Sequence, residues 1–317
     1  MFSIEAMHIP DGFLSVLVSI ALWLITIPIV GYSLRRVGQD LGERQVPLMG
    51  VLAAAIFAGQ MLNFAVAGGT SGHLMGAAIA TILVGPWAAI LTMTCVVSIQ
   101  ALIFQDGGLL VLGANIFNMA VVGVAVAYMA YRTVRKLVNH SKRGILIAGF
   151  IAAWLSIETA SLSVALQLSL SGTSPAALAF PAMAGVHALI GLGEGLITIG
   201  ALTFLLSVRP DLVKSGESSP IGSKVVWGIG LLIVLTLVIA SPLASTRPDG
   251  LEWVATQNNF IDQAREPLYR LIPDYLFPGV PNETLATIVA GILGVTIILV
   301  LSMSIVFSRL NQRSSGG

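Results

Sequence analysis

Long uninterrupted runs of apolar residues restrict the fold of this chain more than any other feature. A run of about 20 such residues crosses a bilayer as a helix, at about 1.5 Å per residue. Charged residues make up only 10% of the chain, whereas a soluble domain has about a quarter. We therefore predict an all-α, polytopic protein of the cell membrane, in contact with lipid. The clear spans are Leu14–Leu34, Pro47–Val66, Leu109–Tyr131, Ile145–Leu170, Met183–Leu206, Val225–Ala244 and Leu285–Phe307.

A further apolar stretch, Leu74–Phe104, is too long for one untilted crossing and short for two. Basic residues collect in cytoplasmic loops, and they follow both the first span and Tyr131. The stretch must then cross an even number of times, and Gly85–Pro86 supplies a hinge because proline ends or kinks a helix. We expect about nine transmembrane helices, with the N-terminus outside and the C-terminus inside.

The composition changes near residue 208. Residues 209–224 are polar and rich in Ser, Gly and Lys, as in a cytoplasmic linker. We expect a seven-helix domain at 7–208 and a two-helix module at 225–308, with an outside segment at 245–284.

Several functions are excluded or disfavoured by what the sequence lacks. It has no G-x-x-x-x-G-K-[ST] loop, so the chain binds no ATP through a P-loop. A net charge of +1 indicates no nucleic-acid partner. No catalytic motif is present, and Gly191-Leu-Gly-Glu-Gly195 lies in an apolar run, which favours close helix packing. We expect a protein that is not an enzyme.

Two of the four histidines fall on the same predicted outer face. His8 precedes the first span, and His73 ends the loop Gly68-Gly-Thr-Ser-Gly-His73. Neutral imidazole binds Ni, Co, Cu and Zn, although a loop histidine can also cap a helix end. Within the spans, Glu158, His187 and Glu194 either pair between helices or lie near a substrate path.

The segment Met7-His8-Ile-Pro-Asp-Gly12, together with the glycine loop ending at His73, resembles the CbiM/NikM substrate-specific component of energy-coupling factor (ECF) transporters for cobalt and nickel. The resemblance covers about residues 7–208. Arg247-Pro-Asp-Gly-Leu-Glu252 resembles the PDGLE module of a NikN-type partner, here fused to the same chain.

The resemblance implies that the chain captures Ni²⁺, or Co²⁺, as a transported substrate. The ligands would be the α-amine of Met7, the backbone nitrogen and imidazole of His8, and the imidazole of His73. Such a planar four-nitrogen set suits Ni(II) or Cu(II). Met7 has a free amine only if the working protein begins there, so we expect initiation or processing at Met7.

The resemblance also implies two partners, a transmembrane coupling protein (EcfT/CbiQ/NikQ-like) and a cytosolic ATPase (CbiO/NikO-like). Three alternatives remain open: a cobalt uptake component for cobalamin synthesis, a metal-independent ECF vitamin binder, and a membrane-embedded enzyme using Glu158, His187 and Glu194.

Overall fold

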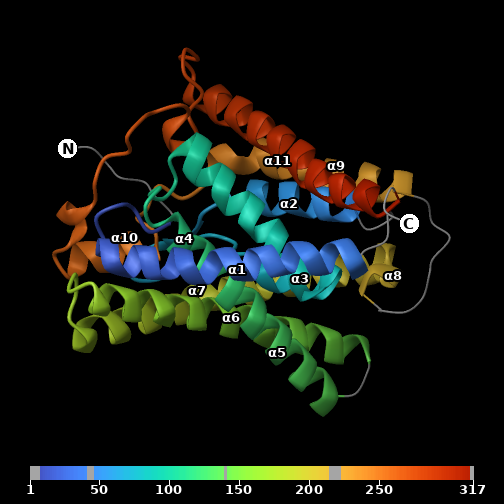
Figure 1. Ribbon diagram of the computed structural model, residues 1–317, viewed down its shortest axis with the longest axis horizontal. Coiled ribbons are helices and arrows are strands. Elements are labelled where there is room, and N and C mark those ends of the chain that lie inside the picture. Colours follow the sequence, from blue (N-terminus) through green and yellow to red (C-terminus); the bar gives the residue numbers. More distant parts are fainter. Residues whose placement is uncertain (1–7, 41–45, 139–140, 214–222, 315–317) are drawn as a thin grey trace.

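The computed structural model describes residues 8–40, 46–138, 141–213 and 223–314, and most of their regular structure is helical. In Figure 1 the helices lie roughly along the long axis, with α10 at one end of the molecule and α8 at the other. The helices are α1 (Val16–Asp40), α2 (Val46–Gln60), α3 (Ala77–Ile99), α4 (Leu112–Ile116), α5 (Gly123–Leu137), α6 (Lys142–Leu170), α7 (Ala176–Val208), α8 (Pro210–Val213), α9 (Ser223–Ala240), α10 (Gly250–Gln257) and α11 (Glu283–Ser314).

Short irregular segments join these helices. A π-helical turn, Gln100–Phe104, extends α3, and another, Phe117–Val122, joins α4 to α5. Single 3₁₀ turns lie at Ser241–Leu243, Ile261–Gln263 and Pro273–Tyr275. Two short antiparallel strands, β1 (Phe64–Ala65) and β2 (Ser71–Gly72), form a hairpin between α2 and α3.

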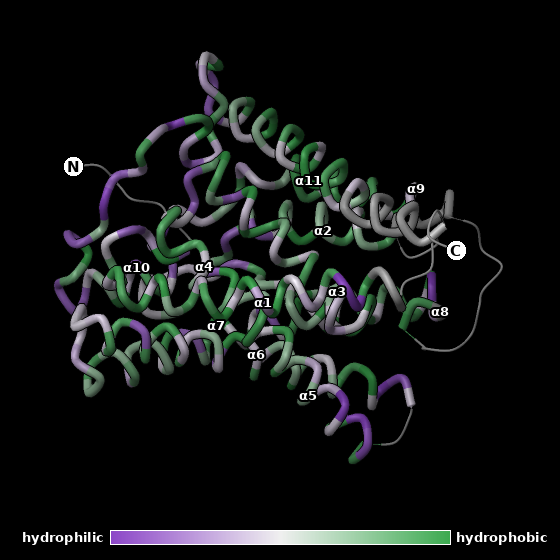
Figure 2. The backbone as a smooth tube through the Cα atoms, viewed as in Figure 1, coloured by the Kyte–Doolittle hydropathy of each residue, from purple (hydrophilic) through white to green (hydrophobic). Residues whose placement is uncertain are grey.

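The helices have the length and composition of membrane spans. Within the described residues, six are long and apolar enough to cross a bilayer, and Leu48–Gln60 and Trp227–Leu243 are shorter apolar helices. Ala77–Phe104 counts as one of the six. Figure 2 shows hydrophobic residues along most of the helices and hydrophilic stretches mainly toward the two ends. The chain is a multi-pass membrane protein.

The chain changes direction inside α3, at the predicted hinge. Gly85 leaves the helical conformation (φ 78°, ψ 169°) directly before Pro86. Leu83 packs in a cluster with Leu206, near the C-terminal end of α7. Met75 and Phe104, which precede and follow the two passes, instead lie toward His8. The segment therefore runs away from His8 and returns, although by length and composition it counts as one candidate span.

Several predicted boundaries were wrong by a few residues. Pro47–Val66 was predicted as one span, but α2 ends at Gln60 because the chain turns into the β1–β2 hairpin. Met183–Leu206 was predicted to begin at Met183, but α7 already begins at Ala176 and contains Pro181. Residues 214–222 of the predicted linker lie outside the described residues.

Small residues let α6 and α7 pack closely. A Cβ on Gly191 would lie 2.8 Å from the Trp154 side chain, and a Cβ on Gly195 would lie 2.5 Å from Phe150. The glycines of the Gly191–Gly195 run therefore serve packing, as predicted. The C-terminal helices α9 and α11 pack along α2, whereas α10 lies against α7 and lines the same cavity as His8.

We predict that Gly195→Ala destabilises the helical bundle by about 1–3 kcal/mol, because the added methyl overlaps Phe150. Thermal unfolding of the detergent-solubilised protein measures the change. Gly200→Ala is the matched control, since a Cβ there meets nothing within 4 Å on the same helix. Equal unfolding temperatures for the two variants would contradict the packing role.

Candidate metal centre

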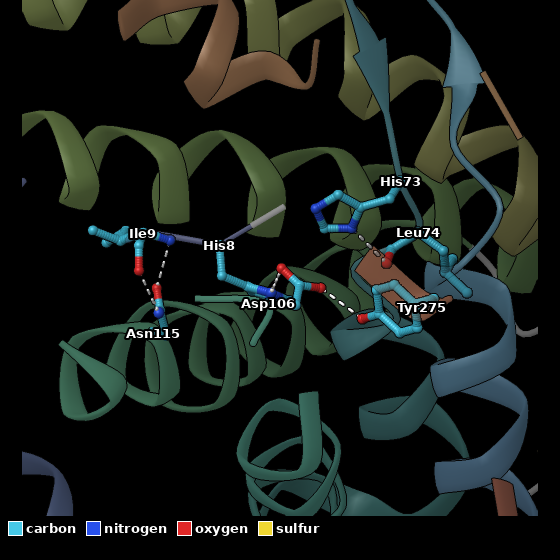
Figure 3. A network of polar contacts seen from close by, with 7 residues as sticks. All are labelled: His8, Ile9, His73, Leu74, Asp106, Asn115 and Tyr275. Carbon is cyan, nitrogen blue, oxygen red and sulfur yellow. Dashed lines mark hydrogen bonds and ion pairs between the residues drawn. The ribbon is translucent and has the colours of Figure 1, made fainter. Parts of the chain in front are cut away.

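His8 and His73, the two histidines predicted to share the outer face, lie close together. The His8 and His73 ring centroids are 5.8 Å apart, with the rings tilted by 50°. His8 is 4% exposed and lies just before α1, whereas His73 follows β2. Figure 3 shows both beside the loop that carries Asp106. The structure thus brings together two side chains from distant parts of the sequence, which the distribution of basic residues had placed on the same face of the membrane.

The segment that carries His8 is pinned to the loop and helix that follow α3. Asn115 on α4 bonds Ile9 twice, accepting from its N–H at 3.1 Å and donating to its C=O at 3.0 Å. The Asp11 carboxylate accepts from the N–H groups of Leu109 and Val111. The His-Ile-Pro-Asp motif therefore fixes the backbone around His8.

The glycine loop that carries His73 is fixed by other contacts. Gly68 and Gly69 have φ near +85°, which glycine adopts without strain, and they make the hairpin turn. Gly72 approaches α7, where a Cβ would lie 2.6 Å from Ile190. The buried Glu194 accepts from the N–H groups of Met75 and Gly76, at 2.8 and 2.9 Å. Glu194 thus anchors the segment directly after His73.

Asp106 joins His8 to the C-terminal module. His8 Nδ1 lies 2.9 Å from Asp106 Oδ1, and the Tyr275 hydroxyl donates to Asp106 Oδ2 at 2.6 Å. Burial alone would raise the pKa of Asp106, but the neighbouring His8 and the Tyr275 hydrogen bond hold the pKa below its usual value. Asp106 is therefore an ionised acceptor, and His8 Nδ1 donates to it.

A cavity of about 100 Å³ opens between these elements. His8, His73 and His187 line it together with apolar side chains from α6 and α7. Asp249 and Gly250 of the C-terminal module also line it. Asp249 caps α10 by accepting from the Glu252 N–H at 2.6 Å, and burial raises the pKa of Asp249 to about 8. Both sequence modules therefore build the walls of one site.

The remaining candidate residues have separate places. Met7 lies outside the described residues. His187 lies at the cavity with its Nδ1 bonded to the Met183 carbonyl, whereas Glu158 is not part of the cavity wall. Among the described residues, no three His, Cys, Asp or Glu side chains form a metal-binding group.

The sequence analysis missed Asp106, Asn115 and Tyr275. The only signal for Asp106 in the sequence is its position, two residues after the end of the apolar stretch Leu74–Phe104. Nothing in the sequence paired it with His8 or Tyr275, which are 98 and 169 residues away.

Two family models match the chain. The model of the cobalt uptake substrate-specific transmembrane region (CbiM) matches residues 8–212, and that of the PDGLE domain matches residues 223–309. A putative fused nickel transport protein NikMN of Archaeoglobus fulgidus is 36% identical over 305 residues, which are 94% of this chain and 98% of that protein.

Two further similar proteins cover about two thirds of this chain. The cobalt transport protein CbiM of Sorangium cellulosum is 35% identical, over 65% of this chain and 94% of its own length. The crystal structure of a truncated transition metal transporter superposes with a TM-score of 0.57 and 32% identity. It covers 63% of this chain and 99% of the solved chain.

We predict that Asn115→Leu destabilises the protein by about 1–3 kcal/mol, because the Ile9 N–H is left buried without a partner whereas the Ile9 carbonyl keeps the Gly108 N–H. Hydrogen exchange at the Ile9 amide should become faster, and the unfolding temperature should fall. Asn258→Leu is the control, because the Asn258 side-chain nitrogen has no partner. Unchanged exchange at Ile9 would show that Asn115 does not fix this segment.

Proposed function

Because this chain belongs to the family of cobalt uptake substrate-specific transmembrane regions, we propose that it captures Ni²⁺ outside the cell membrane for ATP-driven uptake. The observation that carries the proposal is the His8–His73 pair at a buried cavity. Co²⁺ is the alternative substrate, since relatives include both nickel and cobalt transport proteins. The near full-length similarity to a fused nickel transport protein favours nickel.

The proposed ligands are the α-amine of Met7, the amide nitrogen and imidazole of His8, and the imidazole of His73. Consecutive amine, amide and imidazole donors close fused chelate rings in one plane, and His73 supplies the fourth nitrogen. This planar set suits Ni(II), whereas ions that require six oxygen ligands are poorly served. The pinning of Ile9 by Asn115 supports the set, because it holds the neighbouring His8 backbone in place.

The size of the cavity argues against a vitamin-binding role. Sites for drug-sized organic ligands span about 300–1,000 Å³, and this cavity has about 100 Å³. Its walls supply imidazoles, apolar side chains and a few hydrogen-bonding groups, and among the described residues no Phe, Tyr or Trp ring lines it.

Two of the three candidate catalytic groups, Glu194 and His187, have structural partners instead. Both oxygens of Glu194 accept backbone N–H groups, and His187 Nδ1 bonds a carbonyl of its own helix. Glu158 does not line the cavity, although Ile157 and Ser161 on the same helix do, and one of its carboxylate oxygens is buried without a partner. These contacts favour a transport component over a membrane-embedded enzyme.

The energy for uptake must come from partner subunits, since the sequence has no P-loop. We propose a transmembrane coupling protein and a cytosolic ATPase as those partners. In this scheme residues 7–208 bind the metal and 209–224 form the cytoplasmic linker. Residues 225–308 form the PDGLE module, whose segment 245–284 completes the outer wall of the site.

We predict that His8→Ala and His73→Ala each remove most of the nickel bound by the purified protein, because each deletes ligands of the proposed set. Metal analysis after gel filtration measures the bound nickel. His140→Ala is the control, since by sequence that histidine belongs to the basic loop on the opposite face. Full nickel occupancy in both site variants would refute the proposal.

We also predict that the nickel-binding protein begins at Met7. Intact-mass measurement of the membrane-extracted protein determines the first residue. A chain that begins at Met1 and still binds nickel tightly would exclude the α-amine of Met7 as a ligand.

A further inference from the structure

We propose that Asp106 is a positioning residue, which holds the His8 ring by the nitrogen that the nickel chelate needs, and that Tyr275 moderates this hold through its hydrogen bond to Asp106. Nickel then completes its ligand set only as the ring leaves Asp106. This inference rests on the proposed four-nitrogen site and adds to it a control exerted by the C-terminal module.

The first argument is that Asp106 and nickel require the same ring nitrogen of His8. In histidine, Nδ1 is the ring nitrogen that can close a six-membered chelate with the amide nitrogen of the same residue, because Nε2 lies on the far side of the ring. In this structure Nδ1 is 2.9 Å from Asp106 Oδ1, and Nε2 is buried without a partner. Nδ1 cannot donate to Asp106 and bind nickel at once, so the ring must turn and carry its proton on Nε2.

The second argument is the placement of Tyr275. Its hydroxyl donates to Asp106 Oδ2 at 2.6 Å, and its ring stacks on Phe104 at 4.7 Å with an interplanar angle of 14°. Asp274 and Tyr275 both have φ near +55°, a conformation that is uncommon outside glycine and requires support from the surroundings. The C-terminal module therefore places this hydroxyl firmly on the carboxylate that holds His8.

The third argument concerns the direction in which each substitution should change the rate of nickel binding. The hydrogen bond from Tyr275 stabilises the Asp106 carboxylate and makes it a weaker acceptor for His8, because the two donors share one negative charge. Loss of that hydroxyl strengthens the hold, whereas neutralising Asp106 weakens it. Long-range electrostatic attraction changes the association rate in the opposite direction, because removal of any acidic side chain at this end of the molecule slows the arrival of a cation. The two effects are therefore separable by experiment.

The experiment follows nickel association with the purified full-length protein by stopped-flow absorption of the nickel ligand-field band. We expect Asp106→Asn to associate roughly tenfold faster, the scale of a lost hydrogen bond to a charged group. Asp274→Asn is the charge-matched control, because Asp274 is its exposed neighbour in the outer segment and Asn tolerates the same φ. It should associate no faster than the wild type.

The second pair of variants tests the module. Tyr275→Phe should associate severalfold more slowly than Tyr269→Phe, whose hydroxyl bonds the Leu102 carbonyl and does not touch Asp106. The final absorption band should match the wild type in all four variants, since none supplies a ligand.

Each adverse result has a defined meaning. The proposal is overturned if Asp106→Asn is no faster than Asp274→Asn, or if it folds but loses the nickel band. If Asp106→Asn does not fold, the tyrosine pair decides, and equal rates for Tyr275→Phe and Tyr269→Phe overturn the proposal. A wild-type protein without a nickel band refutes the four-nitrogen site itself, whereas a wild-type band with the adverse rates refutes only the positioning role.

Discussion

The attachment of residues 9–11 to residues 108–115 is the interaction on which the site depends. A chain start has few neighbours of its own, and without anchors it would sample many conformations. Here Asn115 satisfies both main-chain groups of Ile9, and Asp11 accepts two N–H groups of the opposite loop. Ile9 also accepts from Gly108 N–H at 2.9 Å. These bonds fix the backbone beside His8.

The C-terminal module completes this arrangement from the other side. Gly12 packs against the Gln263 carbonyl so closely that a Cβ would lie 2.0 Å from it, and Arg265 N–H donates to the Asp11 carbonyl at 2.7 Å. Ser71 of the hairpin bonds Arg247 and Pro248. The two histidine-bearing segments therefore both contact the module that follows the linker, and the site belongs to the whole chain.

The sequence predicted the parts of this architecture that follow from local physics. Apolar length indicated the helices, and the distribution of arginine and lysine predicted the reversal at Gly85–Pro86 and the shared face of His8 and His73. The sequence did not predict Asp106 or Tyr275 as partners of His8, since such pairing depends on how distant segments pack. Glu194 was recognised as an intramembrane carboxylate, but its partners are backbone amides, which carry no residue-specific signal. The positions of Met7 and of the linker residues 214–222 remain predictions.

The reversal within α3 also has an electrical consequence. From Ala77 to Val84 the first pass rises only about 12 Å, less than half of the roughly 30 Å hydrocarbon core. For so short a pass to complete a crossing, the hairpin with His73 has to lie within the hydrocarbon region, recessed from the outer surface. In the proposed function, a doubly charged ion that enters the site then crosses part of the membrane voltage, which is worth about 2.3 kcal/mol per charge for each 100 mV over the full thickness. In an energised cell, negative inside, the voltage itself favours occupancy of the site.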